Sequence, residues 1–139
     1  EAGRIDDAAL SYAQAVEKEP DAALIRIAYA QALLESKTKG AKGRAEAIKQ
    51  LNTALTRERN EPEIHRLLAV AYGQAGDEGL SRLHLAEEAI LQGNADFARR
   101  EAGLAKNALK KDTPAWRRAD DILQATEKDK KDSEKEKSG

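Results

Sequence analysis

The stretch LAVAYGQAGD, from Leu68 to Asp77, decides how this chain folds, because it holds three alanines and two glycines. A stretch with so few large side chains is either a flexible linker or a helix that packs closely against a neighbour. Leu68 and Ala69 lie four and three residues before Tyr72, which is the spacing of one helix face. Gly76 followed by Asp77 is typical of a helix end and the start of the next helix. We therefore predict a helix with Ala69 at a close crossing, where Ala69→Leu would cost about 1–3 kcal/mol of stability.

The composition of the 139 residues favours one helical domain or a short repeat array. Hydrophobic residues make up 40% of the chain, aromatic residues only 4% and charged residues 35%, which predicts a core of small side chains. The net charge of −1 argues against nucleic-acid binding, and no apolar run approaches the roughly 18 residues that cross a bilayer. The absence of cysteine excludes disulfides and thiolate chemistry. The absence of methionine, even at position 1, predicts a piece of a longer protein.

Proline and glycine residues divide the chain into segments whose apolar residues recur at helical spacing. No segment alternates apolar and polar residues, so we predict no strand. Asn60 or Glu61 before Pro62, and Thr113 before Pro114, are typical of helix starts. Turns this short force neighbouring helices to run antiparallel. We predict seven helices, at residues 5–18, 22–36, 43–58, 62–75, 78–92, 95–110 and 114–126.

We expect residues 1–126 to form one helical domain that ends in a capping helix at residues 114–126. Residues 36–43, SKTKGAKG, are rich in lysine and glycine. They predict an enlarged turn, which is either a solvated loop or a contact for an acidic partner. Residues 127–139 have no apolar side chain, so they predict a disordered tail or a frayed helix.

An internal repeat appears in the spacing of small and large apolar residues. Two segments share one alternation: Ala8, Tyr12, Ala15 and Val16 in the first, Ala47, Leu51, Ala54 and Leu55 in the second. This pattern resembles the second helix of a tetratricopeptide repeat, and the pairs Tyr29-Ala30, Leu68-Ala69 and Leu85-Ala86 resemble its first helix. The resemblance implies a right-handed α-solenoid of antiparallel helix pairs, with the first helices lining a concave face. The spacing leaves the register around residues 76–93 open, because the fifth helix either closes one pair or opens the next.

The residue types that usually carry catalysis are sparse and scattered. His65 and His84 are the two histidines, and we interpret both as helix-surface residues, because His84 with Glu88 would supply only half of a metal site. Neither a glycine-rich phosphate loop nor a serine-nucleophile motif is present. Trp116 follows a helix-starting proline and is expected to pack across the end of the helices. We therefore predict no catalytic, cofactor or metal site in this chain.

The repeat pattern predicts a groove that binds protein segments. If Ala30 and Ala69 occupy equivalent positions, six side chains of two first helices face the concave side: Ile27, Gln31, Leu34, Arg66, Val70 and Gln74. This mixture of apolar and polar groups suits an extended or helical peptide. Ile27 and Val70 stand where chaperone-binding repeats carry their clamp residues, so we do not expect binding of a chaperone tail.

From about Glu63 onward the chain resembles the C-terminal repeat region of bacterial periplasmic zinc metalloproteases, the beta-barrel assembly-enhancing protease group. The matching phrases are HRLLAVAYGQAGD, LHLAEEAILQGNADFARREAGLAKNAL and TPAWRRADDIL, the last with Pro114, Trp116, Arg118 and Asp121. The resemblance implies a catalytic domain outside this chain, so zinc is expected only there. It also implies a periplasmic location and binding to the parent protease domain, outer-membrane assembly components or substrates. The alternative is a stand-alone repeat scaffold with no enzymatic domain, which the absence of an upstream HExxH motif would indicate.

Overall fold

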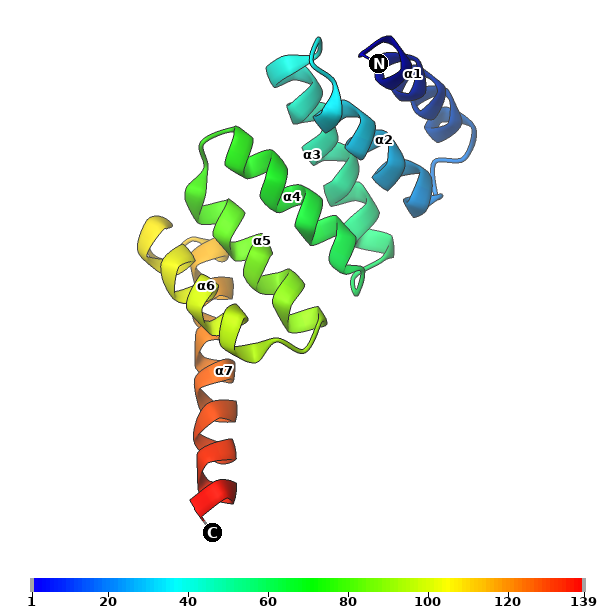
Figure 1. The fold of residues 1–139 in the computed structure, drawn as a ribbon. Coiled ribbons are helices and arrows are strands. Elements are labelled where there is room, and N and C mark those ends of the chain that lie inside the picture. Colours follow the sequence, from blue (N-terminus) through cyan, green and yellow to red (C-terminus); the bar gives the residue numbers. More distant parts are fainter. Residues whose placement is uncertain (1, 139) are drawn as a thin grey trace.

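The computed structural model describes residues 2–138, and over this range the chain forms seven α-helices and no strand. The helices are α1 Ala2–Lys18, α2 Ala23–Glu35, α3 Gly40–Arg57, α4 Pro62–Gln74, α5 Glu78–Leu91, α6 Ala95–Ala108 and α7 Pro114–Ser138. The all-α prediction is therefore confirmed. Each helix packs against the next one along the chain, and in addition α2 contacts α4 and α5 contacts α7 (Figure 1). None of these seven helices is both long enough and apolar enough to cross a membrane.

Two turns of the same design join α4 to α5 and α5 to α6. Gly76 and Gly93 have φ angles of 80° and 76°, which residues with a Cβ rarely adopt. In the first turn the Asp77 N–H donates to the Tyr72 carbonyl at 2.9 Å, and the Asp77 carboxylate accepts from the third N–H of α5 at 3.1 Å. Asn94 makes the same two bonds in the second turn. Both helix ends and both N-caps lie where the sequence predicts them, because this local chemistry needs no distant partner.

The connection between α2 and α3 is shorter than predicted, because α3 begins at Gly40 and only residues 36–39 lie between the helices. The hydroxyls of Ser36 and Thr38 donate hydrogen bonds to the carboxylate of Asp6 in α1, at 2.6 and 2.8 Å. These two bonds lower the pKa of the Asp6 carboxyl. The loop is therefore held against α1, and residues 40–43 belong to a helix instead of an enlarged turn.

The start of α7 packs on α6 through Trp116. The Thr113 hydroxyl accepts a hydrogen bond from the backbone N–H of Trp116 at 3.3 Å, so Thr113 caps α7 as predicted. Lys106 of α6 places its ammonium 4.9 Å from the centre of the Trp116 ring and donates to the carboxylate of Asp120 at 2.8 Å. These contacts tie the first turns of α7 to the side of α6.

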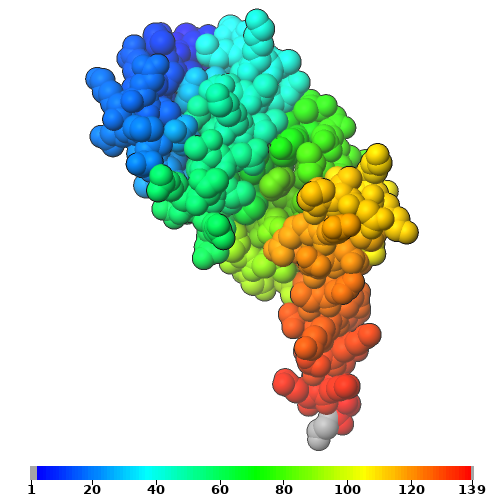
Figure 2. Space-filling view, turned by 180° about the vertical axis from the view of Figure 1, so that it is seen from behind, coloured from blue at the N-terminus to red at the C-terminus, as the bar shows by residue number. Residues whose placement is uncertain are grey.

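The charged residues from Glu127 onward continue α7 to Ser138, so of the two predicted alternatives the structure has a helix and not a disordered tail. Lysine and glutamate have high helix propensity, and opposite charges three or four residues apart support a helix that buries nothing. All residues from 127 to 138 are exposed, and Figure 2 shows this end of α7 standing clear of the other helices. Glu1 and Gly139, which belong to the predicted ranges 1–126 and 127–139, lie outside the described residues.

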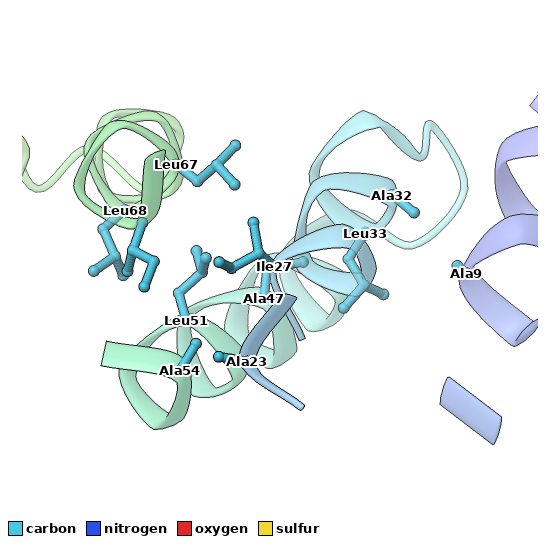
Figure 3. Close-up of a cluster of buried hydrophobic side chains, with 12 residues drawn as sticks. Ala9, Ala23, Ile27, Ala32, Leu33, Ala47, Leu51, Ala54, Leu67 and Leu68 are labelled. Carbon is cyan, nitrogen blue, oxygen red and sulfur yellow. The ribbon is translucent and has the colours of Figure 1, made fainter. Parts of the chain in front are cut away.

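The buried apolar side chains form two clusters that divide the molecule. The N-terminal cluster spans α1 to α4 and consists of Ala9, Ala23, Ile27, Ala30, Ala32, Leu33, Ala47, Leu51, Ala54, Ile64, Leu67 and Leu68 (Figure 3). The C-terminal cluster spans α5 to α7 and consists of Leu83, Ala86, Ala89, Ala98, Ala102, Ala105, Ala119 and Ile122. Alanine at helix crossings lets the backbones approach closely without leaving voids.

Candidate functional site

The structure separates the three groove residues predicted on α2. Ile27 is only 7% exposed and lies between Leu51 of α3 and Leu67 of α4 (Figure 3). Its prediction as a groove residue is corrected, because α4 packs directly against α2 and covers this position. Leu34 is half-buried against the same N-terminal cluster. Gln31 is exposed and donates to the Glu35 carboxylate at 3.1 Å, so it is the one member of the three that faces open solvent.

The three groove residues predicted on α4 all lie on its exposed side. Arg66, Val70 and Gln74 are spaced by four residues, and we call them the α4 stripe. Val70 is 40% exposed, although its neighbours Ala69 and Ala71 are buried. Arg66 donates to the Glu63 carboxylate, with the Nε–Oε2 distance at 2.8 Å, and this pair raises the pKa of Arg66. The stripe therefore exposes the apolar side chain of Val70 between the Arg66 guanidinium, which Glu63 fixes in place, and the Gln74 amide.

The two histidines are not surface residues as the sequence interpretation had them. His65 of α4 is 6% exposed, and its Nδ1 lies 3.0 Å from the Nδ1 of His84 on α5, so one ring donates a hydrogen bond to the other. The two rings stack with centroids 5.3 Å apart, and His84 also stacks on Tyr72 at 5.6 Å. Within residues 2–138 no cluster of three potential metal ligands forms around them. The rings therefore fill the interface between α4 and α5 as a polar stack.

Burial keeps this histidine stack neutral. Desolvation lowers the pKa of His84 to about 4, and the nearby His65 adds to the shift. Desolvation also lowers the pKa of His65, with Glu87 opposing the shift and Arg118 adding to it. At neutral pH the stack carries no charge of its own.

A cleft of about 510 Å³ opens next to His65, at the edge of the stack. We call it the α3–α7 cleft, and its lining residues come from α3, the following loop, α4, α5 and α7: Asn52, Leu55, Thr56, Arg59, His65, Glu87 and Arg118. Arg118 donates two hydrogen bonds to the Glu87 carboxylate, the Nη2–Oε2 bond at 3.0 Å, and these raise the pKa of Arg118. Four helices and one loop thus bring polar side chains to one hollow.

Sequence reasoning missed most of this cleft. His65, Glu87 and Arg118 lie in phrases that carry the family resemblance, but nothing in those phrases marks them as neighbours, and Arg59 lies outside them. His65 and His84 are 19 residues apart on consecutive helices, so their meeting depends on the turn at Gly76 and on the packing of α4 against α5. The only available signal was that both residues lie on predicted helices joined by a tight turn.

The fold and these surfaces define an all-helical protein that exposes a mixed apolar and polar stripe on α4 and a polar cleft between α3 and α7. No protein-family model, no curated protein and no solved structure matches this chain.

Proposed function

We propose that this chain is a non-catalytic helical-repeat domain that binds segments of other proteins. The observation that carries the proposal is the α4 stripe, in which the 40% exposed Val70 lies between Arg66 and Gln74. An apolar contact flanked by hydrogen-bonding groups at four-residue spacing suits a peptide laid along the helix. Gln31 on α2 is exposed as well, but it lines a separate hollow together with Ile5 and Tyr12 of α1.

Two features support the repeat interpretation and its solenoid form. Ala30, Ala69 and Ala86, which the repeat pattern aligns, are 0%, 5% and 0% exposed, as expected of equivalent crossing points. The helices also stack in chain order, with contacts from α2 to α4 and from α5 to α7 that skip one helix. Skipped contacts of this kind arise when helix pairs stack on one another, so that each repeat contacts mainly its neighbours. We place α5 in both pairs, since it packs against α4, α6 and α7.

The wider context is proposed from the phrases that resemble the periplasmic metalloprotease group. In that setting the domain recruits substrates or outer-membrane assembly components to a zinc-dependent protease domain outside this chain. The second candidate is a stand-alone scaffold, which needs only the α4 stripe. A search of the full-length gene for an HExxH motif upstream of this region separates the two. Peptidase activity of the purified chain that a chelator abolishes would contradict the non-catalytic proposal.

The α4 stripe is tested with a library of labelled peptides from outer-membrane proteins, using fluorescence anisotropy to measure affinity. Val70→Asp should weaken the peptides that bind by about tenfold or more, because it places a charge in the apolar contact. Leu104→Asp on α6 is the matched control, since Leu104 is 43% exposed and lies outside the stripe. Equal affinities for wild type and Val70→Asp, with both proteins folded by circular dichroism, would exclude the stripe as the binding surface.

A further inference from the structure

The α3–α7 cleft lies on the other side of α4 from the α4 stripe. His65, which lines the cleft, and Gln74, which ends the stripe, are nine residues apart, or two and a half turns at about 3.6 residues per turn. Two and a half turns place the two side chains on opposite faces of the helix. At about 100° per residue, Val70 also lies about 140° around α4 from His65, so the cleft is a second surface, and Arg66 is the stripe residue nearest to it.

The three charged residues that line the cleft, Arg59, Glu87 and Arg118, leave one positive charge in excess, and Asp121, which acts on Arg118, lies outside the lining. Arg118 is neutralised by its hydrogen-bonded pair with Glu87, and the buried His65 ring is kept neutral by desolvation. Arg59 is exposed at the rim, and within residues 2–138 no carboxylate lies at ion-pair distance from it. Arg57, two residues earlier, differs in this respect because it pairs with Asp21 at 2.7 Å. The cleft thus offers one uncompensated guanidinium.

The rest of the lining suits a polypeptide. Asn52 provides an amide that donates and accepts hydrogen bonds, and Leu55 provides a half-buried apolar wall. The Thr56 hydroxyl donates to the Thr53 carbonyl at 2.7 Å, which leaves its oxygen free to accept a backbone N–H. A volume of about 510 Å³ accommodates a few side chains. A polyanion is a poor fit, because the chain as a whole carries a charge of −1 and nucleic-acid binding needs several cationic contacts.

We propose that the α3–α7 cleft binds a short acidic segment of a partner protein, with one carboxylate against the Arg59 guanidinium. This inference rests on the proposed protein-binding function, but it concerns the face of α4 opposite the stripe. Charge complementarity selects the occupant: a guanidinium without a carboxylate partner recognises carboxylates through charge-assisted, bidentate hydrogen bonds. Asn52 and Thr56 hold the peptide backbone beside that carboxylate.

The test uses two labelled peptides, one with glutamate and aspartate and one with glutamine and asparagine at the same positions. Fluorescence anisotropy should show that the full chain prefers the acidic peptide, and that Arg59→Gln weakens it by about five- to tenfold. Arg57→Gln is the matched control, because it removes the same charge two residues away and should change the affinity less than about twofold. Glu87→Gln should strengthen binding, because it leaves the Arg118 guanidinium free for the peptide carboxylate.

Four outcomes would overturn the cleft proposal. The first is an equal loss of affinity in Arg57→Gln and Arg59→Gln, and the second is equal affinity of the chain for the two peptides. The third is displacement of the acidic peptide by inorganic phosphate at the same concentration as the peptide. The fourth is self-association of the chain that Arg59→Gln abolishes. The last two identify the occupant as a small anion or a second copy of the chain. Val70→Asp should leave the acidic peptide bound. The experiment therefore distinguishes failure of the proposal for the α4 stripe from failure of the proposal for the α3–α7 cleft.

Discussion

The N-terminal and C-terminal clusters pack consecutive helices with side chains of different size. Half of the buried members of the N-terminal cluster are leucine or isoleucine, whereas all but two members of the C-terminal cluster are alanine. The C-terminal half adds ion pairs between its helices, such as Arg82 with Glu101 at 3.0 Å and Lys106 with Asp120 at 2.8 Å. Large side chains gain stability from the apolar area that they bury, while alanine gains it from close backbone approach. The first half should therefore be sensitive to lost volume and the second to added volume.

The largest effect is expected from removing volume in the N-terminal cluster. Leu68 is 0% exposed and packs among Leu51, Ile64 and Leu67. Leu68→Ala should lower the free energy of unfolding by about 2–5 kcal/mol, because it loses buried area and leaves a cavity. Urea unfolding followed by circular dichroism measures the change, and Leu104→Ala on the exposed side of α6 should stay within about 0.5 kcal/mol. A loss below about 1 kcal/mol in Leu68→Ala would remove the distinction between the clusters.

The second prediction concerns the α4–α5 interface, where the two clusters meet at the His65–His84 stack. The pKa of His84 is lowered in the folded chain to about 4, so between this value and its unfolded pKa of about 6.5 the unfolded chain binds more protons. Its contribution to stability is complete above about pH 6.5 and is lost as the pH falls toward 4. The loss should reach about 3 kcal/mol, because one pKa unit is worth about 1.4 kcal/mol. His65, whose pKa is also lowered, changes stability in the same direction.

Urea unfolding of the wild type and of His84→Gln between pH 7 and pH 4 isolates this contribution. Glu87 and Arg118 face the same stack, and both remain in the variant. The wild type should lose stability more steeply than His84→Gln over this range, since glutamine binds no proton. Parallel pH profiles for the two proteins would show that the neutral histidine stack does not tie the clusters together.

The parts of the fold that follow from local chemistry could be predicted from the sequence. Gly76, Asp77, Asn94 and Thr113 perform their predicted roles because a helix end needs only its own backbone and one side chain. The buried state of Ile27 could not be predicted, because it depends on α4 covering α2. An amphipathic spacing alone does not say which helix lies opposite. For the charged tail the sequence left a disordered segment and a frayed helix open, since a run of mixed charges is compatible with both.

The same limit explains the candidate site. The α4 stripe could be found because Arg66, Val70 and Gln74 belong to one helix and share a four-residue spacing. The α3–α7 cleft could not, because Arg59 and Arg118 are far apart in the sequence and meet only through the stacking of four elements. A surface on one helix can be predicted from the periodicity of its residues, whereas a surface between helices can be predicted only when the arrangement of the helices in space is known.

The smallest of the three effects tests whether the C-terminal cluster depends on small side chains. Ala102 of α6 is 0% exposed and lies among other alanines, so Ala102→Leu should destabilise the chain by about 1–3 kcal/mol through overpacking. Ala69→Leu should behave similarly, because the Ala69 carbonyl accepts a hydrogen bond from the Ser81 hydroxyl at 2.8 Å across the α4–α5 crossing. Ala125→Leu, at an exposed position of α7, is the control and should change little. If urea unfolding shows Ala102→Leu to be neutral, the alanines of the second half do not mark close helix approach, and the two clusters differ in composition alone.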